Sequence, residues 1–146
     1  MELKQVLVPT IALTGMHAGA LLFVSTVSAR VLMHAVEQRD SDLIQRFFPV
    51  WWPAGRDLMA PLGAAAAAAN FYCYYRTRQP QFSICGGAML GIILWTGLVM
   101  GENIQELREG STDDVLEVTR SFCWKHHVRT VVSGSAFLTL LYKTFA

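Results

Sequence analysis

The stretch QVLVPTIALTGMHAGALLFVSTVSA, residues 5–29, contains no aspartate, glutamate, lysine or arginine in 25 consecutive positions. About 20 apolar residues are enough for a helix to cross the hydrocarbon core of a bilayer. Residues 58–75 and 79–101 share this property, with 18 and 23 uncharged positions. A fourth stretch, 130–142, has 13 and is long enough only if its helix begins near Phe122. We therefore expect an integral membrane protein that crosses the bilayer several times.

Composition supports this class. The chain has 146 residues, of which 53% are apolar and 16% are charged, whereas a soluble domain has about 25% charged residues. Residues 5–29 are longer than the roughly 7–15 apolar residues of a signal peptide. A net charge of +1 gives no sign of nucleic-acid binding. Cys73, Cys85 and Cys123 lack a metal-type spacing, so they are expected to be buried, unpaired thiols.

The predicted fold is all-α, a single membrane domain over residues 1–146. It is an integral membrane four-helix bundle with helices at about 5–33, 56–76, 81–105 and 122–144. Residues 37–56 (EQRDSDLIQRFFPVWWPAGR) place aromatic rings beside charges and two prolines, which predicts an interfacial aromatic segment. Residues 106–122 (ELREGSTDDVLEVTRSF) predict a short amphipathic helix.

The flanking charges and the small residues predict the setting of this bundle. Lys4, Arg76, Arg78 and Lys143 lie in short flanks on one side, which places both termini on the cytoplasmic side. Glycine pairs four residues apart, such as Gly87 with Gly91, predict close helix contacts. The expected partners are the lipid bilayer, a lipophilic small molecule and a second copy or a larger membrane complex.

Polar residues converge at one membrane face, because alternating helix directions bring the ends of helices one and three beside the starts of helices two and four. The set comprises Arg30, His34, Arg56, Asp57, Glu102, Asn103, His126, His127 and Arg129. We expect a pocket there, roofed by Trp51 and Trp52. The alternative is that these are ordinary helix-end residues at the membrane interface.

His17 is predicted to lie deeper, about 20 Å below Arg30 at 1.5 Å per residue. An ionisable residue near the midplane indicates a functional site. An uncharged, buried His17 that bonds to Asn70, at a similar depth, is the alternative. A metal site formed by His17, His126 and Glu102 would require His126 to lie deeper than this count places it.

Four short segments resemble the anthrone oxygenase-like family of small four-helix membrane proteins, much of which is catalogued as a domain of unknown function. HAGALLFVSTVSARVLM (17–33) resembles the family's glycine–alanine opening, with Ser28 in place of a proline. RDLMAPL (56–62) is similar to the start of its second helix, and MGENIQEL (100–107) to the end of its third, with Gly101 in place of a proline. HHVRT (126–130) fits its fourth-helix signature on His126, Arg129 and Thr130.

The resemblance implies an oxygenase that converts the activated methylene of an anthrone to a quinone with O₂, without a dedicated organic cofactor. The residues supply parts for such chemistry: His126 as the base and Arg129, one helical turn on, to hold the oxyanion. Asn103 is expected to orient the substrate oxygen, and Glu102 to pair with Arg129. Further substrate contacts are expected from His17, Arg30, Arg56 and Trp52.

Two other functions remain open from the sequence. One is a non-catalytic small membrane subunit or scaffold that packs through its small-residue faces, and the other is a channel or transporter. A cavity of several hundred cubic ångströms lined by His126 and Arg129 would favour the enzyme. A filled bundle would favour the subunit. His127 and Lys125 are expected only to mark the membrane boundary, so that His127→Ala would be nearly silent.

Overall fold

The computed structural model describes residues 3–145, and the side chains from residue 5 to residue 145. Its elements are α1 (Leu3–Phe23), the π-helix η1 (Val24–Ser28), α2 (Ala29–Glu37), α3 (Ser41–Thr77), α4 (Pro80–Leu98), α5 (Gly101–Glu109) and α6 (Val115–Phe145). The described chain contains no strand. The expected all-α fold class is therefore confirmed.

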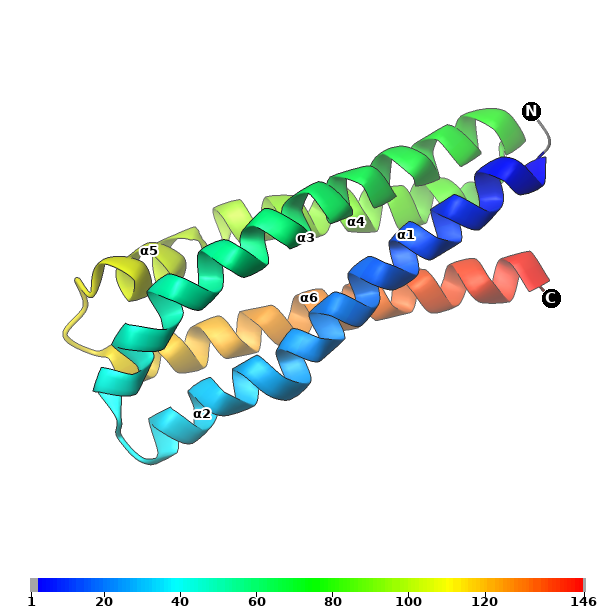
Figure 1. Ribbon diagram of the computed structural model, residues 1–146. Coiled ribbons are helices and arrows are strands. Elements are labelled where there is room, and N and C mark those ends of the chain that lie inside the picture. Colours follow the sequence, from blue (N-terminus) through cyan, green and yellow to red (C-terminus); the bar gives the residue numbers. More distant parts are fainter. Residues whose placement is uncertain (1–2, 146) are drawn as a thin grey trace.

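The long helices lie lengthwise beside one another. Figure 1 shows α1, η1 and α2 as one continuous rod, beside which α3, α4 and α6 run back and forth. Helix α1 packs against α3 and α6, and α4 packs against the same two helices, so the four close into a ring. The start of α1 and the end of α6 lie at the same end of this assembly.

The expected start of the second helix near residue 56 is wrong, because residues 41–77, which include most of the expected aromatic segment, form the single helix α3. Asp40 caps its start by accepting a hydrogen bond from the Leu43 amide at 2.9 Å. The helix contains three prolines, each of which costs about 3 kcal/mol in a helix interior. Ile44, Phe48 and Trp52 follow one another at a spacing of four and are all buried. Burial contributes about 1.5–3 kcal/mol for each such side chain, which is comparable to the cost of the prolines.

Two other predicted boundaries differ from the structure. The expected amphipathic helix and the fourth helix are one 31-residue helix, α6. The expected third helix, 81–105, ends at Leu98 instead and gives way to the separate helix α5. The Lys125 ammonium closes this break by donating to the Val99 carbonyl at 3.0 Å and to the Asn103 side-chain oxygen.

The buried apolar residues form two separate clusters, one toward each end of the assembly. Along α6, the first cluster ends at Cys123 and the second begins at Ala136. The buried residues of α6 between them are His126, Arg129 and Ser133. A polar layer therefore separates two apolar regions.

Two helical stretches, Gln5–Glu37 and Pro80–Leu98, are long and apolar enough to cross a membrane, by length and composition. They correspond to the first expected span, 5–33, and to most of the third, 81–105. The helices that contain residues 56–76 and 122–144 do not meet the same measure among the residues searched.

The small-residue contacts agree with the sequence prediction only in part. In the glycine pair Gly15 and Gly19, a Cβ on Gly15 would lie 2.8 Å from the ring of Phe137 on α6. Gly87 and Gly91 face open space, with no atom within 4 Å of a Cβ placed there. The contact of α4 with α3 uses Gly86 instead, where a Cβ would lie 3.1 Å from the ring of Phe71. The spacing of two glycines therefore does not identify the one that faces a neighbouring helix.

Neighbouring glycines allow a matched test of this contact. Gly86→Leu should lower the free energy of unfolding by about 1–3 kcal/mol, because the added side chain must displace the Phe71 ring. Gly87→Leu should leave stability unchanged or raise it, since nothing stands beside Gly87 and leucine favours helix. Thermal unfolding in detergent measures both. Equal stability of the two variants would contradict this packing of α3 on α4.

Candidate functional site

A cavity of about 120 Å³ lies within the ring of helices. Its walls come from α1 and η1, both halves of α3, the second half of α4, and α6. The lining residues are His17, Val24, Trp51, Trp52, Gly55, Arg56, Met59, Ala60, Ile92, Ile93, Thr96, Gly97, His126 and Arg129. Of the residues singled out from the sequence, His17, Arg56, Trp52, His126 and Arg129 are therefore brought together.

His126 is 1% exposed, and its ring lies between the aromatic side chains around Phe122 and the cavity. Its ring stacks on Phe122 at 6.2 Å, and Phe122 in turn meets the Trp52 ring edge-on at 5.6 Å. Neither imidazole nitrogen makes a hydrogen bond of regular geometry. The Leu21 carbonyl lies near the ring and accepts a hydrogen bond from the Thr130 hydroxyl at 3.3 Å. The ring is held by packing, and its polar atoms are left unused.

Arg129 is 6% exposed and has no acidic partner among the side chains of residues 5–145. Its Nη1 lies 3.8 Å from the sulfur of Met100, and its Nε has no hydrogen-bond partner. No aspartate or glutamate lines the cavity. A buried charge without a partner is costly, so such groups generally bind an ion, a water or a ligand. Arg129 and His126 therefore offer two unsatisfied polar groups to one cavity.

His17 is 2% exposed, which confirms the expected burial. Its Nδ1 lies 3.0 Å from the Ser133 hydroxyl, and its Nε2 would lie 3.0 Å from a Cβ on Gly63. The expected contact with Asn70 is wrong, because Asn70 donates to Thr14 at 2.9 Å instead. Glycine at position 63 leaves the room that the imidazole occupies between α1 and α3.

The other predicted residues lie outside this cluster or at its rim. Arg56 is exposed at the rim and pairs with Asp57 at 2.7 Å. Glu102 is exposed on α5, so the expected Glu102–Arg129 ion pair is wrong. Asn103 is buried but accepts a hydrogen bond from Lys125 and does not line the cavity. Both differences follow from the end of α4 at Leu98, which turns the next residues onto a separate helix.

Arg30 lies against a different surface, a groove between the α1–η1–α2 rod and α6. The described residues contain no group of three histidine, cysteine, aspartate or glutamate side chains placed to hold a metal ion. The structure thus gives no support to a metal site formed by His17, His126 and Glu102.

The π-helix η1 is a part of the site that the sequence interpretation did not identify. Val24 lines the cavity, and the Ser25 hydroxyl lies 2.6 Å from that of Thr130 on α6. π-Helical turns are rare and frequently occur at functional sites. The hydroxyl-rich run Ser25, Thr26, Ser28 is a signal that could have indicated an irregular helix, because such side chains compete for backbone hydrogen bonds.

The cavity opens between α3 and α4. Its only exposed lining residues are Arg56 and Ala60 on α3 and Gly97 on α4. Gly55 and Gly97 have no atom within 4 Å of where a Cβ would stand. A ligand therefore has a route to His126 and Arg129 from the side of the assembly.

Comparisons of the chain with protein-family models, with curated proteins and with solved structures found no match.

An arginine buried without a partner predicts a stability cost that can be measured. Arg129→Met should raise the free energy of unfolding by about 1–4 kcal/mol, because an apolar side chain of similar length replaces an unpaired charge. Arg120→Met, on the exposed face of the same helix, should change it by less than about 0.5 kcal/mol. Thermal unfolding of both variants checks this. A less stable Arg129→Met variant would mean that the guanidinium is well compensated in the empty protein.

Proposed function

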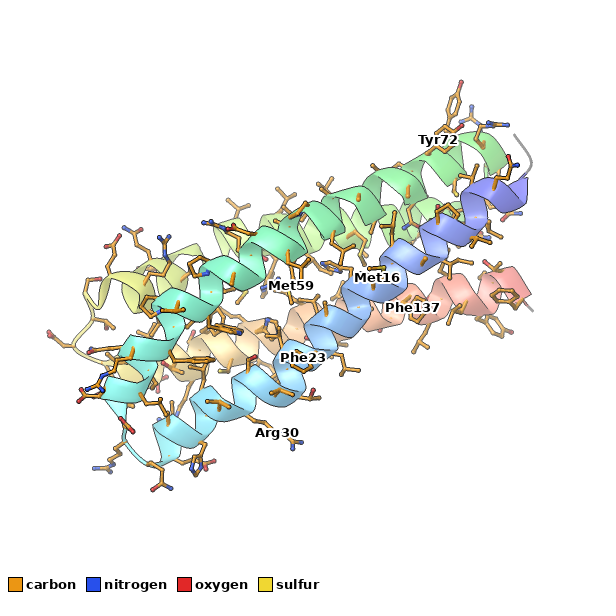
Figure 2. All side chains as sticks on the ribbon, viewed as in Figure 1. Met16, Phe23, Arg30, Met59, Tyr72 and Phe137 are labelled. Carbon is orange, nitrogen blue, oxygen red and sulfur yellow. The ribbon has the colours of Figure 1, made fainter. Side chains whose placement is uncertain are left out.

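We propose that the chain is a multi-pass membrane protein. In it the α1–η1–α2 rod, α3, α4 and α6 form a four-helix bundle across the bilayer. The support is the amount of apolar surface that the helices leave exposed. Large apolar residues are exposed on every rod, among them Val8, Met16, Phe23, Phe71, Ile84, Leu94, Val131 and Leu138. Figure 2 shows side chains such as those of Met16 and Tyr72 around the outside of the helices. Exposed apolar surface on this scale is typical of contact with lipid or with a partner protein.

Polar groups occupy the interior of the same segment. Thr10, Thr14, His17, Asn70 and Ser133 are buried there and bond across or along the helices. Hydrogen bonds between helices are a common means of association in lipid, where burial of apolar surface gives no driving force. The charge-free stretches and the basic short flanks favour an orientation with both termini on the cytoplasmic side.

This placement predicts which positions water can reach. Leu138, which is 65% exposed on α6, should react as Leu138→Cys with a membrane-impermeant maleimide only after the membrane is dissolved and the protein denatured. Glu109→Cys, in an exposed turn region at the other end, should react in intact membranes opened to both sides. The native cysteines are all buried and free, so their background is low. Equal labelling of the two sites in intact membranes would overturn the membrane placement.

We further propose that the cavity binds a lipophilic substrate with an acidic carbon or hydroxyl and catalyses its reaction with O₂. The observation that carries this proposal is the pair of buried, unpartnered groups, His126 and Arg129, on one cavity. An uncharged imidazole accepts the substrate proton, and the guanidinium stabilises the oxyanion that forms. Because Arg129 lacks a carboxylate partner, the ionised substrate would be the group that neutralises it.

The volume of the cavity limits how a substrate sits. Sites for drug-sized ligands measure about 300–1,000 Å³, whereas an apolar cavity of about 150 Å³ accepts a benzene ring. With about 120 Å³, the cavity is smaller than the several hundred cubic ångströms expected. We propose that one ring of the substrate enters between His126 and Arg129. The rest would extend through the opening between α3 and α4 toward lipid.

The proposed reaction balances without an external reductant. A methylene flanked by aromatic rings, R₂CH₂, reacts with O₂ to give R₂C=O and H₂O. His126 removes one proton, the resulting carbanion is oxidised, and both methylene hydrogens leave in the water. The substrate supplies all four electrons that reduce O₂, so an organic cofactor is not required by the stoichiometry. The resemblance to the anthrone oxygenase-like family is the source of this reaction class.

A non-catalytic membrane subunit is the second candidate. The small cavity favours it, because a tricyclic substrate would have to part α3 from α4. In that case the exposed apolar faces would pack against a partner protein or a second copy of the chain.

The test uses a substitution that keeps the size of the buried side chain. His126→Ala would leave a hole beside Phe122, so His126→Gln is the better variant. It should reduce O₂ consumption with an anthrone substrate by about 10²–10⁴-fold, the usual contribution of a general base. His34→Gln, an exposed position on α2, should retain activity.

Both variants must first show the thermal stability of the unsubstituted protein. Equal activity of the two would remove His126 as the base. If the unsubstituted protein consumes no O₂ with anthrones, the catalytic proposal fails and the subunit is favoured.

A further inference from the structure

A second concave surface of about 430 Å³ lies outside the bundle, between the α1–η1–α2 rod and α6. Small and hydroxyl-bearing residues form its floor: Ser25, Ala29 and Thr130. Leu22 and Val131 border one end, and the two basic groups, Arg30 and His127, border the other together with Met33. One end of the groove is therefore apolar and the other is basic.

The basic end has no acidic partner. Arg30 is exposed and makes no ion pair or hydrogen bond with the described part of the chain, and Figure 2 shows its side chain reaching away from α2. His127 is likewise exposed beside it, and no aspartate or glutamate lines the groove. The groove thus presents one fixed positive charge and an imidazole to an anion.

The groove lies where the uncharged, apolar stretch 5–29 ends, which is the expected edge of the membrane-spanning part. Arg30 is the first charged residue after the uncharged stretch 5–29, and Trp124, highly exposed, lies one turn before His127. Exposed tryptophans are typical of the headgroup region. At 1.5 Å per residue, Leu22 lies about 12 Å further into the uncharged stretch than Arg30. A polar headgroup and an apolar chain therefore have complementary ends of one groove.

We propose that this groove binds one anionic phospholipid, with its phosphate on Arg30 and His127 and an acyl chain along Leu22 and Val131. A guanidinium and a phosphate form paired, charge-assisted hydrogen bonds. In a zwitterionic lipid the headgroup's own ammonium neutralises the phosphate, so its attraction to Arg30 is weaker. The inference rests on the proposed membrane placement, but not on the proposed reaction.

The experiment offers the full chain, in detergent micelles, phosphatidylglycerol and phosphatidylcholine with identical acyl chains. Native mass spectrometry should show one phosphatidylglycerol per chain, retained about fivefold to tenfold better than phosphatidylcholine. Arg30→Gln should remove this preference. Arg46→Gln, which changes an exposed arginine on α3, should keep it.

A second variant tests the shape of the groove independently of its charge. Thr26→Trp, at an exposed position on the groove, should displace phosphatidylglycerol while Arg30 is intact. Retention of the lipid by Arg30→Gln or by Thr26→Trp at the level of the unsubstituted protein would overturn the assignment.

Three further outcomes separate the explanations. Displacement of phosphatidylglycerol by an equal concentration of glycerol 3-phosphate would show a phosphate site with no role for the acyl chain, and would overturn the lipid proposal. Equal retention of both lipids would overturn the groove's selectivity and leave the membrane placement standing. The absence of any lipid binding would overturn the lipid proposal, and labelling of Leu138→Cys then decides whether the membrane placement fails with it.

Discussion

Among the described side chains, residues 5–145, Arg129 is the one buried residue of the aspartates, glutamates, lysines and arginines, and the rest of the structure accommodates it. Its guanidinium lies in the layer between two apolar clusters, where no carboxylate approaches. Neither cluster can extend through this layer, because apolar side chains packed over Arg129 and His126 would leave polar atoms permanently unsatisfied. The cavity is therefore a consequence of the residues that surround it. A bundle with two leucines at these positions would close.

Sequence patterns predicted the helices and much of the cavity. Charge-free stretches identified the four rods, and alternating directions correctly brought His126, Arg129, Arg56 and Trp52 together, although their chemical roles remain predictions. The failures have local causes. Prolines in residues 41–56 indicated a break, but buried contacts of Phe48 and Trp52 keep α3 continuous, and such contacts depend on the partner helix. Glu102 was assigned to the site because the third helix was expected to continue. The break after Leu98 is fixed by Lys125, 26 residues away from Val99, which no local pattern reveals.

The two apolar clusters on either side of the polar layer differ in composition. The cluster around Phe48, Phe122 and Trp52 is built from interlocked rings and supports one side of His126. The cluster at the other end is built mainly from small and aliphatic residues around Phe82 and Met89, and it includes two of the three thiols. Between them, the hydrogen bond of His17 to Ser133 joins α1 to α6. Packed neighbours thus hold the groups that we propose bind a ligand, which is the arrangement that preorganised sites require.

The π-helix has a geometric effect on everything that follows it. In η1 the Ala29 amide donates to the Val24 carbonyl, five residues back, so the rod contains one more residue than a regular helix of that length would need. Each residue turns an α-helix by about 100°, so this extra residue shifts the angular phase of α2 against α1 by that amount. Removal of any one residue from 24–28 would restore a uniform helix and rotate Ala29, Leu32 and Val36 away from their buried positions. The five-residue turn therefore acts as a phase offset, through which a single straight rod presents His17 inward at one end and Leu32 inward at the other.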